Sequence, residues 1–208
     1  GFGAYGSWRD RGSFDVVAQG MSGAMVAQGG GPENVPMNCP WGLADQVGSM
    51  TFAYGIMGAI VARERFGVGQ KVDVSQLGAM VTLQALSVQA FLHTGQQGTR
   101  PAGKPLNPIF AWYQASDGGW RTIGILDPKH WPKLCHALGR EDMITDPRCA
   151  EPFARQDNAD WLAAELQSTV STMPRQHWLD RISAQDVPTG PVYDYASVVQ
   201  DPQFWDNG

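Results

Sequence analysis

One segment constrains the fold of this 208-residue chain more than any other, residues 46 to 65. Its apolar residues recur every three or four positions, which predicts an α-helix. They are Val47, Met50, Tyr54, Met57 and Val61, with Phe52, Ile56 and Ile60 widening the apolar surface. A helix this apolar is expected to be mostly buried. Gly48, Gly55 and Gly58 each weaken a helix by up to about 1 kcal/mol relative to Ala, so we expect another backbone to pass close by.

Weaker patterns surround this helix in the first half of the chain. They predict a helix from about 15 to 25, a short strand over 70–75 and a helix over roughly 76–93. Ser75 is expected to cap the last of these helices. Glycines and prolines crowd residues 95–108, which makes this stretch the best candidate for a linker or domain boundary.

After residue 108 the sequence changes to a small α+β pattern. Two β-rich runs, 110–115 and 120–125, flank Ser116-Asp117-Gly118-Gly119, which has the chemistry of a hairpin turn. Helices are expected over about 128–138, 157–171 and 174–184, then an extended segment at 188–193 and a short helix at 194–200. The chain is expected to belong to the α/β class, with this second part as a small α+β domain.

Composition excludes several classes of function. The 20 acidic and 15 basic residues give a net charge of −5 without a basic block, so we expect no nucleic-acid partner. No apolar run approaches the roughly 18–20 residues that cross a bilayer, so we expect no membrane partner. The start is not a signal peptide. Because it also lacks an initiator Met, we expect a fragment or a processed product.

Cysteines and histidines predict neither a disulfide framework nor a metal site. Cys39, Cys135 and Cys149 are widely spaced and odd in number, which is typical of reduced thiols in a cytoplasmic protein. The four histidines form no HxH or HExxH pattern. We therefore expect no metal.

Two aspartates are candidates for chemistry. Asp45 follows a mainly apolar stretch and stands where the long helix begins, so we expect it to be the N-cap. A carboxylate held in an apolar site is one way to prepare a nucleophile, although a plain cap is the commoner role. Asp15, beside Phe14, is the second candidate, and capping is again its simplest role. Their relative geometry does not follow from the sequence.

Several motifs, taken in order, resemble the class III CoA-transferases, the CaiB/BaiF family that includes formyl-CoA transferase. The first are Gly1-Phe2-Gly3-Ala4-Tyr5-Gly6 and Phe14-Asp15-Val16-Val17-Ala18-Gln19-Gly20-Met21-Ser22-Gly23. The most specific are Leu43-Ala44-Asp45, Gly55-Ile56-Met57-Gly58-Ala59-Ile60, Arg63-Glu64-Arg65 and Gly67-Val68-Gly69-Gln70-Lys71-Val72-Asp73-Val74-Ser75. Weaker ones continue the likeness to Val187-Pro188-Thr189-Gly190-Pro191-Val192, so it covers nearly the whole chain.

The resemblance implies a domain organisation. Residues 1–75 would be the end of a Rossmann-like large domain, with the catalytic Asp and the buried helix. Residues 76–108 would be a helix and linker, 109–193 a small α+β domain, and 194–208 the start of a return linker. Family members are about twice this length and form interlocked homodimers, so this chain would be their middle portion, with doubtful activity alone.

The resemblance also implies a reaction. The Asp that matches Asp45 attacks the thioester of a donor acyl-CoA, and an enzyme–CoA thioester then passes coenzyme A to a carboxylic acid acceptor. Coenzyme A is thus a substrate. Racemases of the same fold carry a His before the acid that matches Asp15; here that position is Phe14, which cannot carry a proton. The alternatives are a racemase and a non-catalytic interaction module or remnant.

Further binding residues are proposed with less support. Arg11 and Lys104, with Arg9 and Arg100, are candidates for the phosphates of coenzyme A, or they are ordinary surface charge. The region from Lys104 to Pro108 matches a glycine-rich covering loop in formyl-CoA transferase-like members but is not glycine-rich here. Phe14 and Asp15 would adjoin the substrate. A pocket for a hydrophobic or aromatic acid would explain four aromatic residues, and core packing explains them equally well. They are Phe14, Trp41, Phe52 and Trp112.

Overall fold

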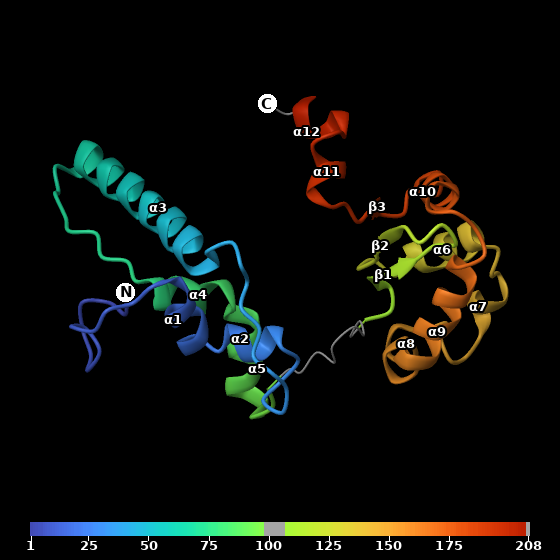
Figure 1. Cartoon of the computed structure of the whole chain (residues 1–208), viewed down its shortest axis with the longest axis horizontal. Helices are drawn as coiled ribbons and strands as arrows, with labels where there is room; N and C mark the ends of the chain where they lie inside the picture. Colours follow the sequence, from blue (N-terminus) through green and yellow to red (C-terminus); the bar gives the residue numbers. More distant parts are fainter. Residues whose placement is uncertain (98–106, 207–208) are drawn as a thin grey trace. The chain divides into compact units, whose positions relative to one another are not determined.

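The computed structural model describes residues 1–97 and 107–206, which form two compact units, Gly1–Ala102 and Gly103–Gly208 (Figure 1). In the residues described, the regular structure of the first unit is entirely helical, and the second unit combines helices with a small antiparallel sheet. Together they give the α/β class that the sequence predicted. The glycine–proline stretch 95–108 lies mostly outside the described residues.

The described residues of the first unit form five helices. They are α1 Asp15–Met21, α2 Ala24–Gln28, α3 Leu43–Phe66, α4 Gln76–Leu83 and α5 Ala85–Thr94. Helices α1, α3 and α4 pack against one another, with Ala18, Ala44 and Met80 at the centre of their contact. The predicted helix over 46–65 is confirmed as α3, and Ser75 caps α4 by accepting a hydrogen bond from the backbone N–H of Gly78 at 2.9 Å.

Three predictions of local structure in this unit were wrong. Residues 70–75 do not form a strand, because no other described strand of the first unit lies beside them to complete a ladder. The helix expected over 76–93 breaks at Gln84, whose side-chain amide donates to the carbonyl of Met80 at 3.0 Å. The helix expected over 15–25 breaks at Gly23, which adopts a φ of 83° that ends a right-handed helix.

The segment after α3 passes close to two of its glycines. A Cβ at Gly55 would lie 2.9 Å from Val72 Cγ1, and a Cβ at Gly48 would lie 3.8 Å from the Cα of Gln76. The expected neighbouring backbone is therefore found at Gly48, at an ordinary contact distance, whereas the close neighbour of Gly55 is a side chain. Gly58 has nothing within 4 Å of a built Cβ and has no such role within the described structure.

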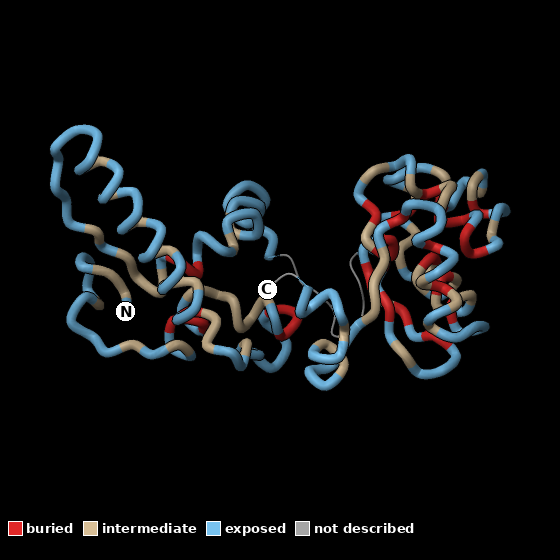
Figure 2. Tube along the Cα trace, turned by 90° about the horizontal axis from the view of Figure 1, so that it is seen from above, coloured by how far each residue is buried: buried red, intermediate tan, exposed pale blue. Residues whose placement is uncertain are grey.

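The expectation that α3 is mostly buried was wrong for this chain. Of its 24 residues only Ala44 is buried, while Met50 is 71% and Tyr54 84% exposed. Most of the length of α3 is coloured as exposed in Figure 2. Helices α1 and α4 contact α3, and the described residues leave the rest of its apolar surface uncovered. The hydrophobic pattern showed how apolar the helix is. The described residues do not include a segment that covers the rest of its apolar surface.

The sheet of the second unit is built on the predicted hairpin, which is confirmed. Strands β1 Phe110–Gln114 and β2 Trp120–Gly124 pair antiparallel with Trp112 opposite Thr122, and β3 Thr189–Pro191 pairs antiparallel with β2. Asp117 shapes the turn: Oδ1 accepts from the N–H of Gly119 at 3.0 Å and Oδ2 from that of Arg175 at 3.1 Å. Alternate residues of β1 and β2 face a common core.

Helices cover one face of this sheet and carry most of the core. They are α6 His130–Leu138, α7 Asp142–Thr145, α8 Pro152–Asp157, α9 Ala159–Val170 and α10 Arg175–Ser183, followed by α11 Tyr195–Val198 and α12 Pro202–Asp206. Leu134, Leu162, Leu166 and Ile182 are fully buried among them. Trp178 joins this core and donates its ring N–H to the carbonyl of Val170 at 2.8 Å, which satisfies its one polar atom.

Gly29→Ala is expected to destabilise the first unit. A Cβ at Gly29 would overlap the carbonyl oxygen of Val35 and lie 3.2 Å from that of Met25, so backbone must move. We expect a loss of about 1–3 kcal/mol in the free energy of unfolding, measured by urea denaturation. Gly58→Ala is the matched control, because it adds the same methyl group in open space and should stabilise α3 by up to about 1 kcal/mol. Equal stability of the two variants would contradict this account.

Candidate active site

The predicted nucleophile Asp45 lies in the first turn of α3, but it is not the N-cap. Gly42 occupies the cap position with φ 65° and ψ 45°, and Asp45 is the third helical residue. The left-handed backbone explains why a glycine stands at the start of the helix. The prediction of an Asp45 cap was therefore wrong, and its carboxylate is free for other contacts.

The second candidate, Asp15, provides the cap from another helix. Its Oδ1 accepts hydrogen bonds from the backbone N–H of Ala44 at 2.7 Å and of Asp45 at 3.4 Å. These are two of the N–H groups that a helix start leaves without partners, and the positive end of the helix dipole favours an anion there. The structure thus joins Asp15 to the backbone of Asp45, a proximity that the sequence did not reveal.

A buried glutamine holds Asp15 in this position. Gln19 is 1% exposed, and its Nε2 donates to Asp15 Oδ2 at 2.6 Å and to the carbonyl of Cys39 at 2.9 Å. Its Oε1 accepts from the N–H of Cys39 at 2.8 Å, so all of its contacts are structural. Sequence analysis missed Gln19, although its spacing of four from Asp15 on a predicted helix is a usable signal.

The carboxylate of Asp45 faces a pocket of about 450 Å³. Its lining residues are Gly1, Asp45, Gly48, Ser49, Phe52, Val74 and Gln76. Oδ1 of Asp45 accepts a hydrogen bond from Nε2 of Gln76, the first residue of α4. No cationic side chain is among the lining residues, so within the described structure the carboxylate stays an unpaired anion. Sequence analysis also missed Gln76.

The N–H groups at the start of a helix are suitable donors to a reacting oxyanion. Those of Ala44 and Asp45 are already bound by Asp15. Any donor to a reacting oxygen of Asp45 must therefore come from elsewhere, and Gln76 is the side chain in contact.

Apart from Phe52, the other predicted binding residues in the described part of the chain do not line this pocket. Phe14 stands at the N-cap of α1 and is 81% exposed. Arg11 stacks over the ring of Trp8 with its guanidinium carbon 4.1 Å from the ring centre. Lys104 and Arg100 lie outside the described residues. The structure thus brings Asp15, Asp45 and Phe52 to one place and leaves Phe14 and Arg11 outside it.

Another aromatic candidate belongs to the second unit. Trp112 lines a separate pocket with Trp120, Thr122 and Val192 on the sheet face away from the core. Trp41 is 66% exposed and lines neither pocket. The four aromatic residues proposed for one apolar pocket therefore do not form one within either described unit.

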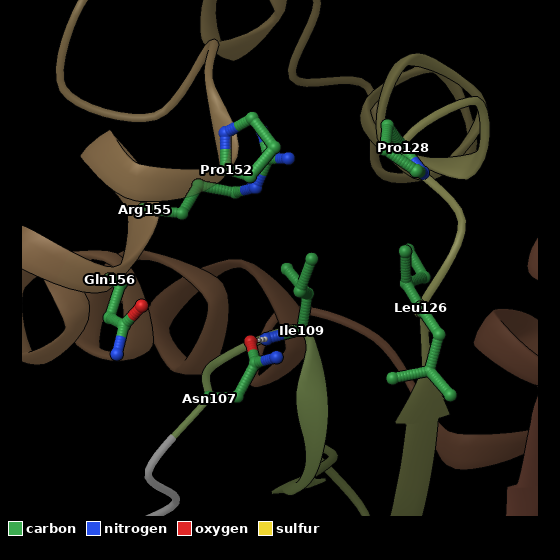
Figure 3. A pocket seen from close by; sticks show the side chains of 8 residues that line it. Asn107, Ile109, Leu126, Pro128, Pro152, Arg155 and Gln156 are labelled. Atoms are coloured by element: carbon green, nitrogen blue, oxygen red, sulfur yellow. Dashed lines mark hydrogen bonds between the residues drawn. The ribbon is translucent and has the colours of Figure 1, made fainter.

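A different cavity of about 330 Å³ lies between the sheet and α8 in the second unit (Figure 3). Its lining residues are Asn107, Ile109, Ile125, Leu126, Pro128, Pro152, Arg155 and Gln156. Arg155 is nearly buried there, and Nη1 donates to the carbonyls of Cys149 at 2.6 Å and Ala150 at 2.7 Å. Burial lowers the pKa of this guanidinium. Among the described residues, the lining of this cavity holds no carboxylate, thiol or imidazole that could act as a nucleophile.

The two buried cysteines of the second unit are poor nucleophiles. Burial raises the pKa of the Cys135 thiol to about 12 and also raises that of Cys149, so both stay protonated near neutral pH and are poor nucleophiles. Within residues 1–97 and 107–206, no three His, Cys, Asp or Glu side chains are grouped to hold a metal ion. Across the same residues, no helix combines the length and the apolar character needed to span a membrane.

Known proteins with similar sequences act on CoA thioesters. The acetyl-CoA:oxalate CoA-transferase of Acetobacter aceti is 33% identical over 205 residues, which cover 98% of this chain and 52% of that protein. The probable fatty acyl-CoA transferase Rv3272 of Mycobacterium tuberculosis is 29% identical over 216 residues, covering 99% of this chain and 55% of that protein. The chain thus spans about half the length of the curated relatives it matches.

Solved structures show the same likeness in three dimensions. The orthorhombic form of Rv3272 superposes with a TM-score of 0.84 and 28% identity, covering 99% of this chain and 53% of that one. A CAIB/BAIF family protein from Brucella suis gives a TM-score of 0.78 and 29% identity, covering 100% and 55%. The family model for CoA-transferase family III matches residues 1–208. This chain belongs to CoA-transferase family III.

Proposed function

We propose that the protein carrying this chain transfers coenzyme A from an acyl-CoA donor to a carboxylic acid, with Asp45 as the nucleophile. The observation that carries the proposal is the unpaired carboxylate of Asp45 facing a pocket at the start of α3, with its backbone tied to Asp15. Relatives named as acetyl-CoA:oxalate and succinyl-CoA:mesaconate CoA-transferases support the reaction type.

The reaction begins with attack on the donor. An oxygen of the Asp45 carboxylate bonds to the thioester carbonyl carbon, the C–S bond breaks, and coenzyme A leaves as a thiolate. The product on the enzyme is a mixed anhydride. The thiolate then attacks Cγ of Asp45, the donor acid leaves as a carboxylate, and an aspartyl–CoA thioester remains. A covalent relay of this kind divides one difficult exchange into easier steps.

The second half reverses these steps with the acceptor. The acceptor carboxylate attacks Cγ of the aspartyl–CoA thioester and expels the thiolate, which forms a new anhydride. The thiolate then attacks the acceptor's carbonyl carbon, so acyl-CoA leaves and the Asp45 carboxylate is restored. Proton balance is simple, because both the nucleophiles and the leaving groups are anions. The mechanism therefore asks the protein for positioning and oxyanion donors, and not for a general base.

Supporting roles follow for the other predicted residues. Because both carboxylate oxygens of Asp15 accept hydrogen bonds from protein groups, we assign Asp15 to positioning the start of α3 and not to substrate contact. Arg11, which is exposed, keeps its proposed role toward the phosphates of coenzyme A. Racemisation gains no observation in its favour, since Phe14 has no group that carries a proton.

The organisation of the whole protein is also a proposal. We propose that residues 1–75 complete a large domain, that 76–108 link it to a small domain over 109–193, and that 194–208 begin the return. The relatives are about twice as long as this chain, and α3 exposes an apolar surface. Both facts support an interlocked homodimer in which further chain segments cover α3.

Asp45→Asn in the polypeptide that carries this sequence is expected to abolish CoA transfer, because an amide does not attack the thioester. Wild-type protein incubated with acyl-CoA should carry a mass addition of CoA at Asp45, removed by hydroxylamine. Asp10→Asn, which changes an exposed carboxylate paired with Arg9, is the control and should keep full activity. Normal turnover by Asp45→Asn, or an adduct on another residue, would refute the assignment.

Asp15→Ala is expected to weaken the start of α3. Loss of the acceptor for two helix N–H groups should lower the free energy of unfolding by about 0.5–2 kcal/mol. Asp15→Asn keeps one acceptor oxygen and should lose less. Urea denaturation of both variants measures the effect, and stability of Asp15→Ala at the wild-type value would count against the cap.

A further inference from the structure

We propose that Gln76 is a further catalytic residue, whose side-chain amide binds Oδ1 of Asp45 and donates to that oxygen when it becomes an oxyanion. The inference rests on the proposed function of Asp45 and adds a donor that the reaction requires. It starts from a side chain that touches the reacting carboxylate in the described structure.

The contact has only one chemically acceptable orientation. Nε2 of Gln76 donates to Oδ1 of Asp45, whereas the reverse orientation would place Oε1 against a carboxylate oxygen, two acceptors without a proton between them. Oε1 instead points away and is buried without a hydrogen-bond partner among the described residues. Gln76 makes this contact although its own Oε1 is left without a hydrogen-bond partner, and this arrangement favours a functional role.

The backbone on both sides of Gln76 is held in place. Ser75 caps α4 through the N–H of Gly78 at 2.9 Å, and the N–H of Leu77 donates to the carbonyl of Gly1 at 3.4 Å. Gly48 lies across from Gln76, with a built Cβ 3.6 Å from Gln76 Cγ, which is an ordinary contact distance. The side chain therefore extends from a fixed helix start, past Gly48, to Asp45.

Other donors near this oxygen are already occupied. The N–H groups of Ala44 and Asp45 donate to Asp15, and no cationic side chain lines the pocket in the described structure. A neutral amide has a further advantage over Lys or Arg, because it orients the carboxylate without neutralising the nucleophile. Gln76 is thus suited to both the resting carboxylate and its reaction.

The chemistry places negative charge on Oδ1 at defined steps. While Oδ2 carries the acyl group of the anhydride, the incoming thiolate bonds to Cγ and the carbonyl electron pair moves onto Oδ1. Collapse restores the Cγ–Oδ1 double bond and breaks the Cγ–Oδ2 bond, so the donor carboxylate leaves with Oδ2. Attack of the acceptor on the aspartyl–CoA thioester charges Oδ1 again. Since Oδ1 is a neutral carbonyl before each attack, the donated hydrogen bond strengthens most in the transition state.

The test compares variants of Gln76 in the polypeptide that carries this sequence. Gln76→Met keeps length and flexibility but has no donor, and we expect kcat to fall by about 10²-fold with the KM for acyl-CoA within a few-fold. Decay of the aspartyl–CoA adduct on adding acceptor, followed by mass spectrometry, should slow in parallel. Gln76→His, whose Nε2–H reaches a similar distance, should recover part of the loss. Gln89→Met, at an exposed position of α5, is the matched control.

The outcomes separate this inference from the proposed function. Wild-type kcat and adduct decay in Gln76→Met, with Asp45→Asn inactive, would overturn the role of Gln76 and leave the transferase in place. Transfer by Asp45→Asn, or no adduct on wild-type protein, would overturn both. A slow Gln76→Met variant with a wild-type thermal midpoint, partly rescued by Gln76→His, would support the inference. If Gln76→Met also unfolds at a lower temperature, Gln76→His decides: normal stability with no rescue contradicts the role.

Discussion

The candidate site depends on one interaction. The carboxylate of Asp15, in α1, caps the start of α3. It satisfies backbone N–H groups that would otherwise be unpaired at the start of a long helix, and it places an anion at the positive end of the helix dipole. Because Asp15 takes the cap, Asp45 is released from that role and points its carboxylate into the pocket. The buried Gln19 holds Asp15 in place by donating a hydrogen bond to its other carboxylate oxygen, Oδ2.

Two carboxylates of the same type thus have opposite roles, set by their surroundings. Asp15 is surrounded by donors from its own unit, and both of its oxygens are engaged. Asp45 meets one neutral amide and an open pocket. Chemistry requires an oxygen that is free to form a bond, so the less satisfied carboxylate is the better nucleophile. Gly42, in the left-handed conformation, is the N-cap three residues before Asp45, so Asp45 lies inside the first turn of the helix.

The exposed surface of α3 has a physical meaning of its own. A helix with so apolar a surface is stable in water only when another element covers it, since most helix stability in proteins comes from packing. Within the described residues α1 and α4 cover part of it. The second unit differs: β1, β2 and the helices α6, α9 and α10 enclose a continuous core of their own. The second unit therefore buries its core with its own residues, whereas the described residues of the first unit leave much of α3 uncovered.

Local patterns in the sequence determined the long helix, the hairpin with Asp117 at its turn, the Ser75 cap and the family, because each depends on residues close together in the chain. They did not determine the missing strand at 70–75 or the partners of Asp45. Those depended on which distant groups meet: Asp15 and Gln76 stand 30 and 31 residues from Asp45 in sequence, yet both bond to it. Hydrophobic periodicity and turn motifs carry no information on which distant residues come into contact. Only the packing of α1 and α4 against α3 decided these contacts.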